Sequence, residues 1–340
     1  MGLFSSFVEN KSMLFRTELH PHKLSFKISH SHKLLSIGSC FSDCMGTRFQ
    51  DAQFDIISNP FGVLYNPLSI FRNLERALNK ETIQTDQIIE SKSAYFHYQF
   101  HSEINANSVF DLSEKVSIIN HSVSESLLKA NYLFITLGTA FVYYLGKTAI
   151  SVANCHRQSA DIFDKRMLSV DEIVQTFNSF YQSLKNQNPN IKVLITVSPV
   201  RHIKDTLELN AVSKAVLRLS CHEIVKQNTA NVSYFPAYEM MMDDLRDYRF
   251  YKEDMIHPTI QAESYIWEKF AESYFSEETL KINKEVAEIQ TALSHRPFNT
   301  EREEYKQFMR KIEEKILKLK DKIPATRLFE KLALKLSSEC

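Results

Sequence analysis

The sequence predicts an α/β fold with a central parallel sheet, and three observations support it. Short apolar runs, typical of strands buried on both faces, alternate with longer stretches that are suited to helices. The 340 residues are 44% hydrophobic and 11% aromatic, which is enough to form a large core without disulfides or metals. No apolar run approaches the roughly 18 residues that span a bilayer. We therefore expect a globular protein without membrane association.

The elements of the predicted sheet lie within the first 275 residues. Strands are expected at residues 34–37, 54–57, 132–137, 193–197 and 232–235. Helices are expected after Cys40 and at residues 67–78, 170–184, 210–227 and 259–274. Residues 141–152 have the pattern of a short hairpin that turns at Gly146 and Lys147. Strands that alternate with helices in this way form parallel sheets.

Two regions depart from this alternation. Residues 80–129 are too long for a simple connection, so we expect an inserted subdomain or lid within an α/β domain of residues 13–275. Residues 276–340 are densely charged, and their apolar residues recur every three or four positions on either side of Pro297. Thr300 and Glu303 form a capping box where the second helix would begin. This region is predicted to be a helical hairpin, suited to forming a homodimer.

The charge and cysteine content narrow the class of protein. Lys and Arg number 41 and so do Asp and Glu, so the net charge is zero and favours no nucleic-acid partner. The five cysteines form no CxxC pair and follow no signal-peptide pattern. We expect a cytoplasmic protein with reduced thiols and no cofactor.

The first candidate for catalysis is a thiol that follows the first strand. In doubly wound sheets, ligands bind at the carboxyl ends of the strands. The first strand ends in Gly38-Ser39-Cys40, and a sharp turn there places Ser39 or Cys40 at the start of a helix. Free N–H groups and the helix dipole favour a thiolate or an oxyanion at such a position. Either residue is therefore a candidate nucleophile.

Two further glycines follow other strand ends. Gly62 lies in Asn-Pro-Phe-Gly after the second strand, and Gly138 follows the third. A glycine at such a place lets a ligand approach the backbone, although ordinary turns use glycine as well. The backbone N–H of Gly62 is a candidate second donor to an oxyanion.

A late motif supplies a candidate base. Asp254 precedes His257 by three residues on a loop that enters a helix, so the carboxylate can orient the imidazole toward a nucleophile. The same pattern also occurs as a simple helix cap. Its value lies in its combination with the thiol at Cys40.

This combination resembles the SGNH, or GDSL-type, hydrolases, and Gly38-Ser39-Cys40-Phe41-Ser42 resembles the motif of the GSCFA-domain family. The resemblance extends from about residue 15 to residue 299 and includes the strings NPFGVLYNP, GTA, NCH, SPVRH and DMIHP. It implies a flavodoxin-like three-layer α/β/α fold and an esterase-type activity on an ester or O-acyl substrate, for example an O-acetyl carbohydrate.

The sequence departs from the SGNH pattern at two places. Aligning the first motif puts Cys40 at the nucleophile and Ser39 at the preceding Asp, and a thiol ionises more readily than a hydroxyl. The third block reads Gly138-Thr139-Ala140 and lacks the usual Asn of the oxyanion hole. Asn154, beyond the hairpin, is a candidate replacement. The remaining candidate substrate-binding residues are His156, Arg201 and His202. Of these, Arg201 and His202 are candidates to bind an anionic group of the substrate.

The predicted mechanism is two-step acyl transfer. His257, oriented by Asp254, takes the proton of Cys40, the thiolate attacks the acyl carbon, and water cleaves the acyl-enzyme.

There are two alternatives to this mechanism. A zinc site at His97 and His101 conflicts with their strand-like pattern, which separates them by about 13 Å, so we expect no metal. A catalytically degenerate scaffold that binds a partner is the other alternative.

Overall fold

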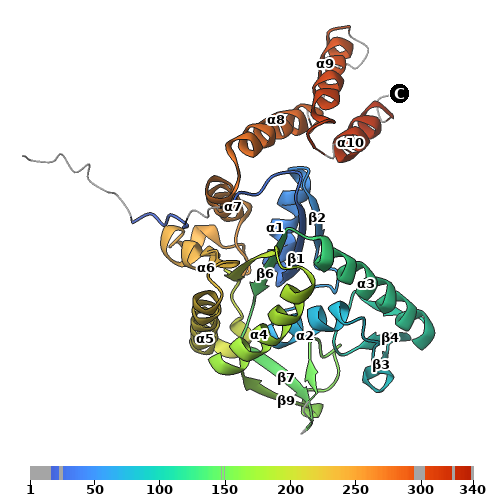
Figure 1. Cartoon of the computed structure of the whole chain (residues 1–340), viewed down its shortest axis with the longest axis vertical. Coiled ribbons are helices and arrows are strands. Elements are labelled where there is room, and N and C mark those ends of the chain that lie inside the picture. Colours follow the sequence, from blue (N-terminus) through green and yellow to red (C-terminus); the bar gives the residue numbers. More distant parts are fainter. Residues whose placement is uncertain are drawn as a thin grey trace, which may run out of the picture.

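A computed structural model shows an α/β protein with an appended helical module (Figure 1). It describes residues 17–22, 26–146, 148, 150–294, 303–323 and 326–337. Five parallel strands form the central sheet in the order β11-β10-β6-β1-β2. Their bounds are β1 (Lys33–Gly38), β2 (Asp55–Ser58), β6 (Tyr132–Leu137), β10 (Lys192–Val197) and β11 (Val232–Tyr234). The predicted α/β fold and its five parallel strands are confirmed.

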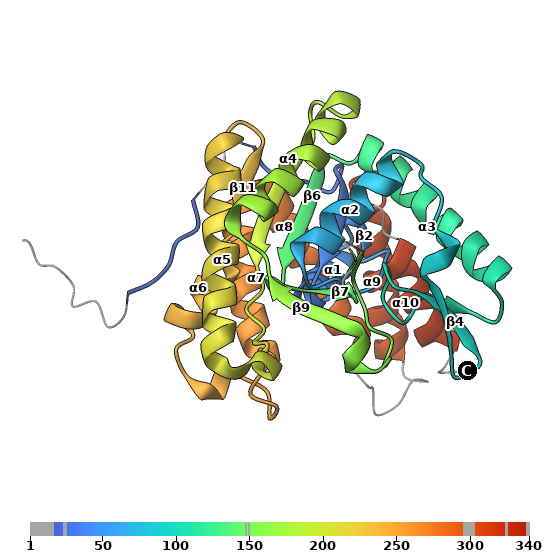
Figure 2. The ribbon, with the colours of Figure 1, turned by 90° about the horizontal axis from the view of Figure 1, so that it is seen from below.

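Helices cover both faces of the sheet because successive strand residues point to opposite sides. Leu35 and Ile37 of β1 pack on one face and Leu34 on the other. The first face carries α2 (Pro67–Leu78), α3 (Val109–Lys129), α4 (Val170–Gln187) and α5 (Thr206–Gln227). Figure 2 shows these four helices beside one another in the order α5, α4, α2, α3. The second face carries α1 (Cys40–Asp51), α6 (Ala237–Glu239) and α7 (Ile260–Tyr274).

Two small antiparallel sheets extend the first face. One contains β3 (Ile88–Ser91), β4 (Ala94–His97) and β5 (Asn105–Ala106). The other contains β7 (Phe141–Leu145), β8 (Ser151–Val152) and β9 (Phe163–Met167). The prediction of an insertion at 80–129 is too broad, because helix α3 within it packs into the main core through Leu112, Val116, Val123 and Leu127. Within residues 80–129, the β3–β5 sheet is therefore the part that is added to the layers.

The C-terminal module has a small core of its own. It consists of α8 (Glu277–Ser294), α9 (Glu303–Leu319) and α10 (Thr326–Ser337), so a third helix joins the expected pair. Gln290 Nε2 donates to the carbonyl of Asp51 at 2.6 Å, and Lys331 lies 3.6 Å from the Asp51 carboxylate. These contacts hold the module against the end of α1. The capping residue Thr300 lies outside the described residues, and the homodimer stays a prediction.

No helix in the described part of the chain is both long and apolar enough to cross a membrane.

Candidate active site

The passage from β1 to α1 fixes the position of the candidate thiol. Gly38 has φ +144°, and a Cβ there would lie 2.1 Å from the carbonyl oxygen of Thr136 on the neighbouring strand β6. Ser39 then donates its N–H to that same carbonyl at 3.1 Å and occupies the N-cap position of α1 without a capping hydrogen bond from its side chain. Cys40 consequently begins the first turn of α1. Only glycine permits so close an approach of the two strands at this turn.

Cys40 and Ser39 have different environments. The Ser39 side chain is fully buried, and its Oγ has no hydrogen-bond partner among the described residues. Cys40 is partly exposed and lines a cleft. Access to a substrate therefore favours Cys40 as the nucleophile and leaves Ser39 a structural role.

The cleft has a volume of about 570 Å³ and lies between α1 and the two loops that precede α5 and α7. It brings the thiol of Cys40 and the imidazole of His257 to one space, although 217 positions of sequence separate them. Its lining residues are Cys40, Phe41, Cys44, Thr47, Arg48, Asp51, Val200, Lys252, His257, Pro258, Ile260 and Glu263. The two residues therefore line one cleft, and their action as a nucleophile and a base stays a prediction.

Asp254 fixes the orientation of His257. Its Oδ2 lies 2.7 Å from His257 Nδ1, and its Oδ1 accepts the N–H groups of Ile256 and His257 at 2.9 and 3.0 Å. These hydrogen bonds, first of all the one from the His257 backbone, hold the pKa of Asp254 well below its usual range. The carboxylate is thus ionised at neutral pH and engages Nδ1, which leaves Nε2 available for another group.

Arg201 supports the loop that carries this pair. Its guanidinium lies 3.8 Å from the centre of the Tyr251 ring, and its backbone N–H donates to the Ile256 carbonyl at 3.3 Å. Lys252 N–H donates to the carbonyl of His257 at 2.8 Å. Arg201 therefore contacts the loop before α7, whereas its predicted binding of an anionic substrate group remains a prediction.

The environment of Cys40 favours the neutral thiol. Burial raises the pKa of Cys40, and the nearby Asp43 carboxylate raises it further. The backbone N–H groups of Cys40 and Phe41 and the side chain of Lys214 act in the opposite direction. Burial also raises the pKa of Asp43, against a 2.6 Å hydrogen bond from Asn59. A resting thiol needs a base to become a nucleophile, and His257 is the imidazole that shares its cleft.

The two glycines expected at the oxyanion site have other partners. Gly62 donates its N–H to the carbonyl of Asn59, and Gly138 donates to Tyr65, both at 2.8 Å. The prediction that Gly62 supplies an oxyanion donor is therefore wrong for this conformation, because that donor is already used. Its backbone has φ +69°, and a Cβ there would lie 2.3 Å from the His101 Cβ. Gly62 thus allows the His101 segment to pack closely.

Asn154 and His156 belong to a separate hydrogen-bond network. Asn154 Oδ1 accepts from Ser102 Oγ at 3.3 Å and from the His156 N–H at 2.9 Å. The buried His156 ring places its Nε2 3.0 Å from the His97 carbonyl. Neither Asn154 nor His156 is among the described residues that line the cleft, so their assignment to the oxyanion and substrate site is corrected. They join the β4 segment to the β7–β8 hairpin.

His202 lies beside the site but as a neutral group. Its backbone N–H donates to Asn210 Oδ1 at 2.9 Å, and its ring meets the edge of Tyr65 at 5.4 Å between centroids. Burial, together with the positive charge of Lys214 and the nearby His257, lowers the pKa of His202 to about 3. A neutral ring can bind an anion only as a hydrogen-bond donor, so the binding of an anionic substrate group by His202 stays a prediction.

Lys214 is a residue of this region that the motifs missed. It lies on α5 and is 1% exposed, in the same stripe as the buried Leu217, Cys221 and Ile224. Its Nζ donates to the carbonyls of Gly138 and Ser198, each at 2.7 Å. A lysine on the apolar stripe of an expected helix was the available signal, because lysine is almost never fully buried without polar partners.

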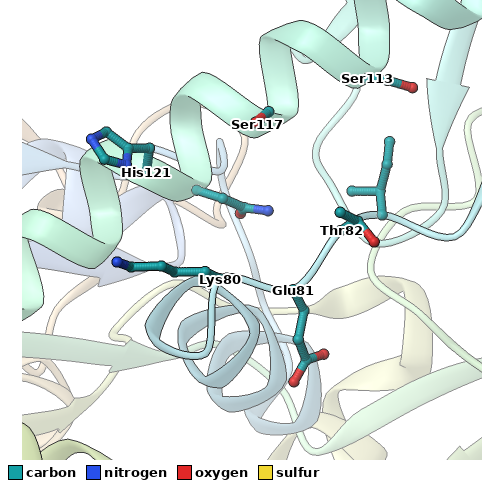
Figure 3. Close-up of a pocket in the computed structure, with 8 residues that line it drawn as sticks. Lys80, Glu81, Thr82, Ser113, Ser117 and His121 are labelled. Carbon is teal, nitrogen blue, oxygen red and sulfur yellow. The ribbon is translucent and has the colours of Figure 1, made fainter.

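A second cavity, of about 250 Å³, lies between α3 and the segment that follows α2 (Figure 3). Lys80, Glu81, Ser117 and His121 are among its lining residues. Helix α2 starts near the carboxyl ends of the strands and runs back along the sheet. This cavity, which follows α2, therefore lies toward the end of the sheet where the strands begin. Within the described ranges, no cluster of three or more His, Cys, Asp or Glu side chains is arranged to hold a metal ion.

Two family models match the sequence. Residues 33–270 match the model of the GSCFA family, and residues 286–334 match that of the GSCFA domain protein C-terminal domain. No curated protein matches the sequence. Similar solved structures include a carbohydrate esterase family 3 protein from Talaromyces cellulolyticus, at 10% identity over 74% of this chain and 98% of that one, with TM-score 0.36. Another is a mutant acetyl-xylooligosaccharide esterase from Geobacillus Stearmophilus, at 14% identity over 73% and 96%, with TM-score 0.33.

Proposed function

This chain belongs to the GSCFA family, and from that premise we propose that it is an acyl hydrolase in which Cys40 of the family motif is the nucleophile. One observation carries the proposal: Cys40 and His257 line the same cleft, and Asp254 fixes the His257 ring through a 2.7 Å contact at Nδ1. A nucleophile, a base and a group that orients the base are the three components of nucleophilic acyl transfer.

The chemistry proceeds in two steps. His257 Nε2 accepts the proton of the Cys40 thiol, and the sulfur forms a bond to the acyl carbon of an ester. The tetrahedral intermediate collapses, the carbon–oxygen bond breaks, and His257 returns the proton to the leaving alkoxide. Water, activated by the same imidazole, then attacks the thioester and releases the acid and the free thiol. Asp254 stays ionised and stabilises the imidazolium in both steps.

The start of α1 is the proposed oxyanion site. The backbone N–H groups of Cys40 and Phe41 stabilise negative charge at the sulfur, and a helix N-terminus carries a partial positive charge. The N–H groups of Gly62 and Gly138 are engaged elsewhere, so stabilisation rests on α1 itself. Loss of one oxyanion donor typically costs about 10²- to 10³-fold in rate.

The cleft lining supports a substrate with a small acyl group and a polar alcohol. Phe41, Val200 and Pro258 are apolar, whereas Arg48 and Glu263 are charged and lie 3.9 Å apart. Such a mixture suits an O-acyl carbohydrate or a similar hydroxylated compound, which combines hydroxyl groups with apolar faces. The substrate class within the proposed function is thus an ester of a polyhydroxylated molecule.

The test uses short-chain nitrophenyl esters and O-acetylated sugars with purified protein. We expect turnover by the wild type, and at least about 10²-fold slower turnover for Cys40→Ala and for His257→Ala. His222→Ala is a matched control, since His222 lies on α5 outside the cleft. Full activity in both active-site variants would refute this mechanism.

A degenerate scaffold that binds a partner is the second candidate, and one observation favours it. Both glycine N–H groups expected at an oxyanion site are hydrogen-bonded internally. If it is correct, no ester tested is hydrolysed, and Cys40 reacts with thiol-directed acylating probes no faster than an ordinary thiol.

A further inference from the structure

Lys214 is placed where the register of the sheet brings it near Cys40. Gly38 of β1 pairs with Thr136 of β6, and Thr136 pairs with Thr196 of β10, so these three residues form one row across the sheet. Cys40, Gly138 and Ser198 each lie two residues beyond that row. The Lys214 ammonium bridges the carbonyls of Gly138 and Ser198. Because neighbouring strands are about 4.8 Å apart, this ammonium lies beside the strand end that leads to Cys40.

Among the described residues, no carboxylate is in electrostatic contact with Lys214 to balance its charge. The groups in electrostatic contact with it are the Cys40 thiol on α1, the His202 ring after β10 and, at 5.9 Å, the face of the Tyr238 ring on α6. The Asp43 carboxylate on α1 raises the pKa of Cys40, and Tyr65 is in electrostatic contact with Cys40 as well. An ammonium has three hydrogens, and carbonyl groups accept two of them. Of the residues that the structure describes, Cys40 is the one whose negative charge acts on Lys214, and the reaction forms its thiolate.

We propose that Lys214 is a positioning residue for the hydrolase reaction, a buried ammonium that stabilises the Cys40 thiolate from beside the strand end that leads to α1. This inference rests on the proposed function.

The reciprocal effects of the two groups agree with this role. The positive charge of Lys214 lowers the pKa of Cys40, and the negative charge of the thiolate raises the pKa of Lys214. Burial lowers the pKa of Lys214 to about 7, and this value includes the opposing, raising effect of Cys40. Two coupled groups of this kind stabilise each other's charged form by the same free energy.

The test is the rate of Cys40 alkylation by iodoacetamide as a function of pH, followed by mass spectrometry of the peptide that contains Cys40. The variants are Lys214→Met, which removes the charge and the donors, and Lys214→Gln, which removes the charge but keeps an N–H donor. Lys192→Met is the control, because Lys192 also donates to a backbone carbonyl, at 3.2 Å. It lies at the first residue of β10, at the other end of the strand from Ser198. The fully buried Cys221 reports unfolding when it becomes alkylated.

We expect both Lys214 variants to raise the alkylation midpoint of Cys40 by one pH unit or more, which is an about tenfold loss of rate below the midpoint. The Lys192 control should leave the midpoint unchanged. An unchanged Cys40 profile in a folded Lys214 variant would overturn the proposal. Alkylation needs no ester turnover, so this outcome is distinct from a failure of the proposed hydrolase function.

A measurement on Lys214 itself covers the case in which neither variant folds. In protein with ¹³C-labelled lysine, the Cε signal of Lys214 should titrate well below the usual lysine range. Cys40→Ser should shift that titration to lower pH, because the stabilising thiolate is gone. Identical titrations in wild type and Cys40→Ser would refute the coupling.

Discussion

Asp254 Oδ2 lies 2.7 Å from Nδ1 of His257, while two backbone N–H groups of the same loop bind its Oδ1. The carboxylate therefore orders the loop and orients the ring at once. In Asp254→Asn the amide can still accept the backbone N–H groups, but it lacks the charge that stabilises an imidazolium. We expect an about 10²- to 10⁴-fold loss of kcat with little change in KM, measured with a nitrophenyl ester. A variant that keeps wild-type kcat would show that His257 acts without this carboxylate.

Arg201 should affect catalysis through the loop that it supports. Replacing it with Met removes the guanidinium that stacks on Tyr251 at 3.8 Å, so the His257 loop loses a contact. We expect an about tenfold lower kcat, because small displacements of a base are costly. Arg249→Met is the control, since Arg249 stacks on Phe250 at 4.8 Å but is largely exposed. Equal kinetics in the two variants would remove Arg201 from the positioning role.

The backbone at Gly38 should tolerate no side chain. A Cβ at Gly38 would lie 2.1 Å from the Thr136 carbonyl, whereas a Cβ at Gly146 has nothing within 4 Å. Gly146 has φ +51°, in the left-handed region that other residues can enter, whereas Gly38 has φ +144°, so Gly146→Ala is a control for a positive φ without a steric contact. We expect Gly38→Ala to lower the free energy of unfolding by several kcal/mol and Gly146→Ala by about 1 kcal/mol, measured by urea denaturation. Similar losses in both would mean that strands β1 and β6 separate easily at this point.

The buried His97 should make the fold sensitive to acid. Its Nδ1 accepts the N–H of Gln99 and its Nε2 lies 3.1 Å from the Gln84 carbonyl, so the neutral ring is satisfied. Burial lowers the pKa of His97 to about 4. An unfolded histidine binds a proton near pH 6.5, so between pH 6.5 and 4 the unfolded state holds more protons and stability falls as the pH falls.

This loss should be of order 3 kcal/mol between pH 7 and pH 4, from the difference between the two pKa values of His97. It is measured by urea denaturation at a series of pH values. His97→Gln should reduce the loss in that window by about this amount, while the buried His202, whose pKa is also lowered, keeps its own share. His121→Gln should not reduce the loss, because the His121 side chain is 68% exposed. If the wild type and His97→Gln lose stability in parallel on acidification, His97 is not the cause.

The sequence was sufficient to predict the sheet and the three groups of the proposed mechanism. The strands of the sheet are apolar on both faces, so they appear as continuous runs, and Cys40 follows the first of them directly. The pair Asp254 and His257 was recognisable because both residues lie within one turn of chain. These features are local, and local patterns are what a single sequence contains.

Features that depend on contacts between distant segments could not be predicted. Helix α3 looked like part of an insertion because residues 80–129 are too long for a simple connection, yet its apolar stripe packs into the main core. The N–H of Gly138 is used by Tyr65, which lies more than 70 positions earlier. Lys214 acts between two strand ends that only the sheet brings together. In each case the sequence shows which residue is present but not which distant residue it contacts.

The acyl-enzyme is the most direct test of Cys40 as the nucleophile. The protein is mixed with nitrophenyl acetate, quenched in acid within the first turnovers, digested, and the peptide that holds Cys40 and Cys44 is fragmented by mass spectrometry. We expect one acetyl group on Cys40, none on Cys44, and none at that position in Cys40→Ala. Ester turnover that persists in Cys40→Ala, with no acetyl group on Cys40 of the wild type, would contradict the mechanism.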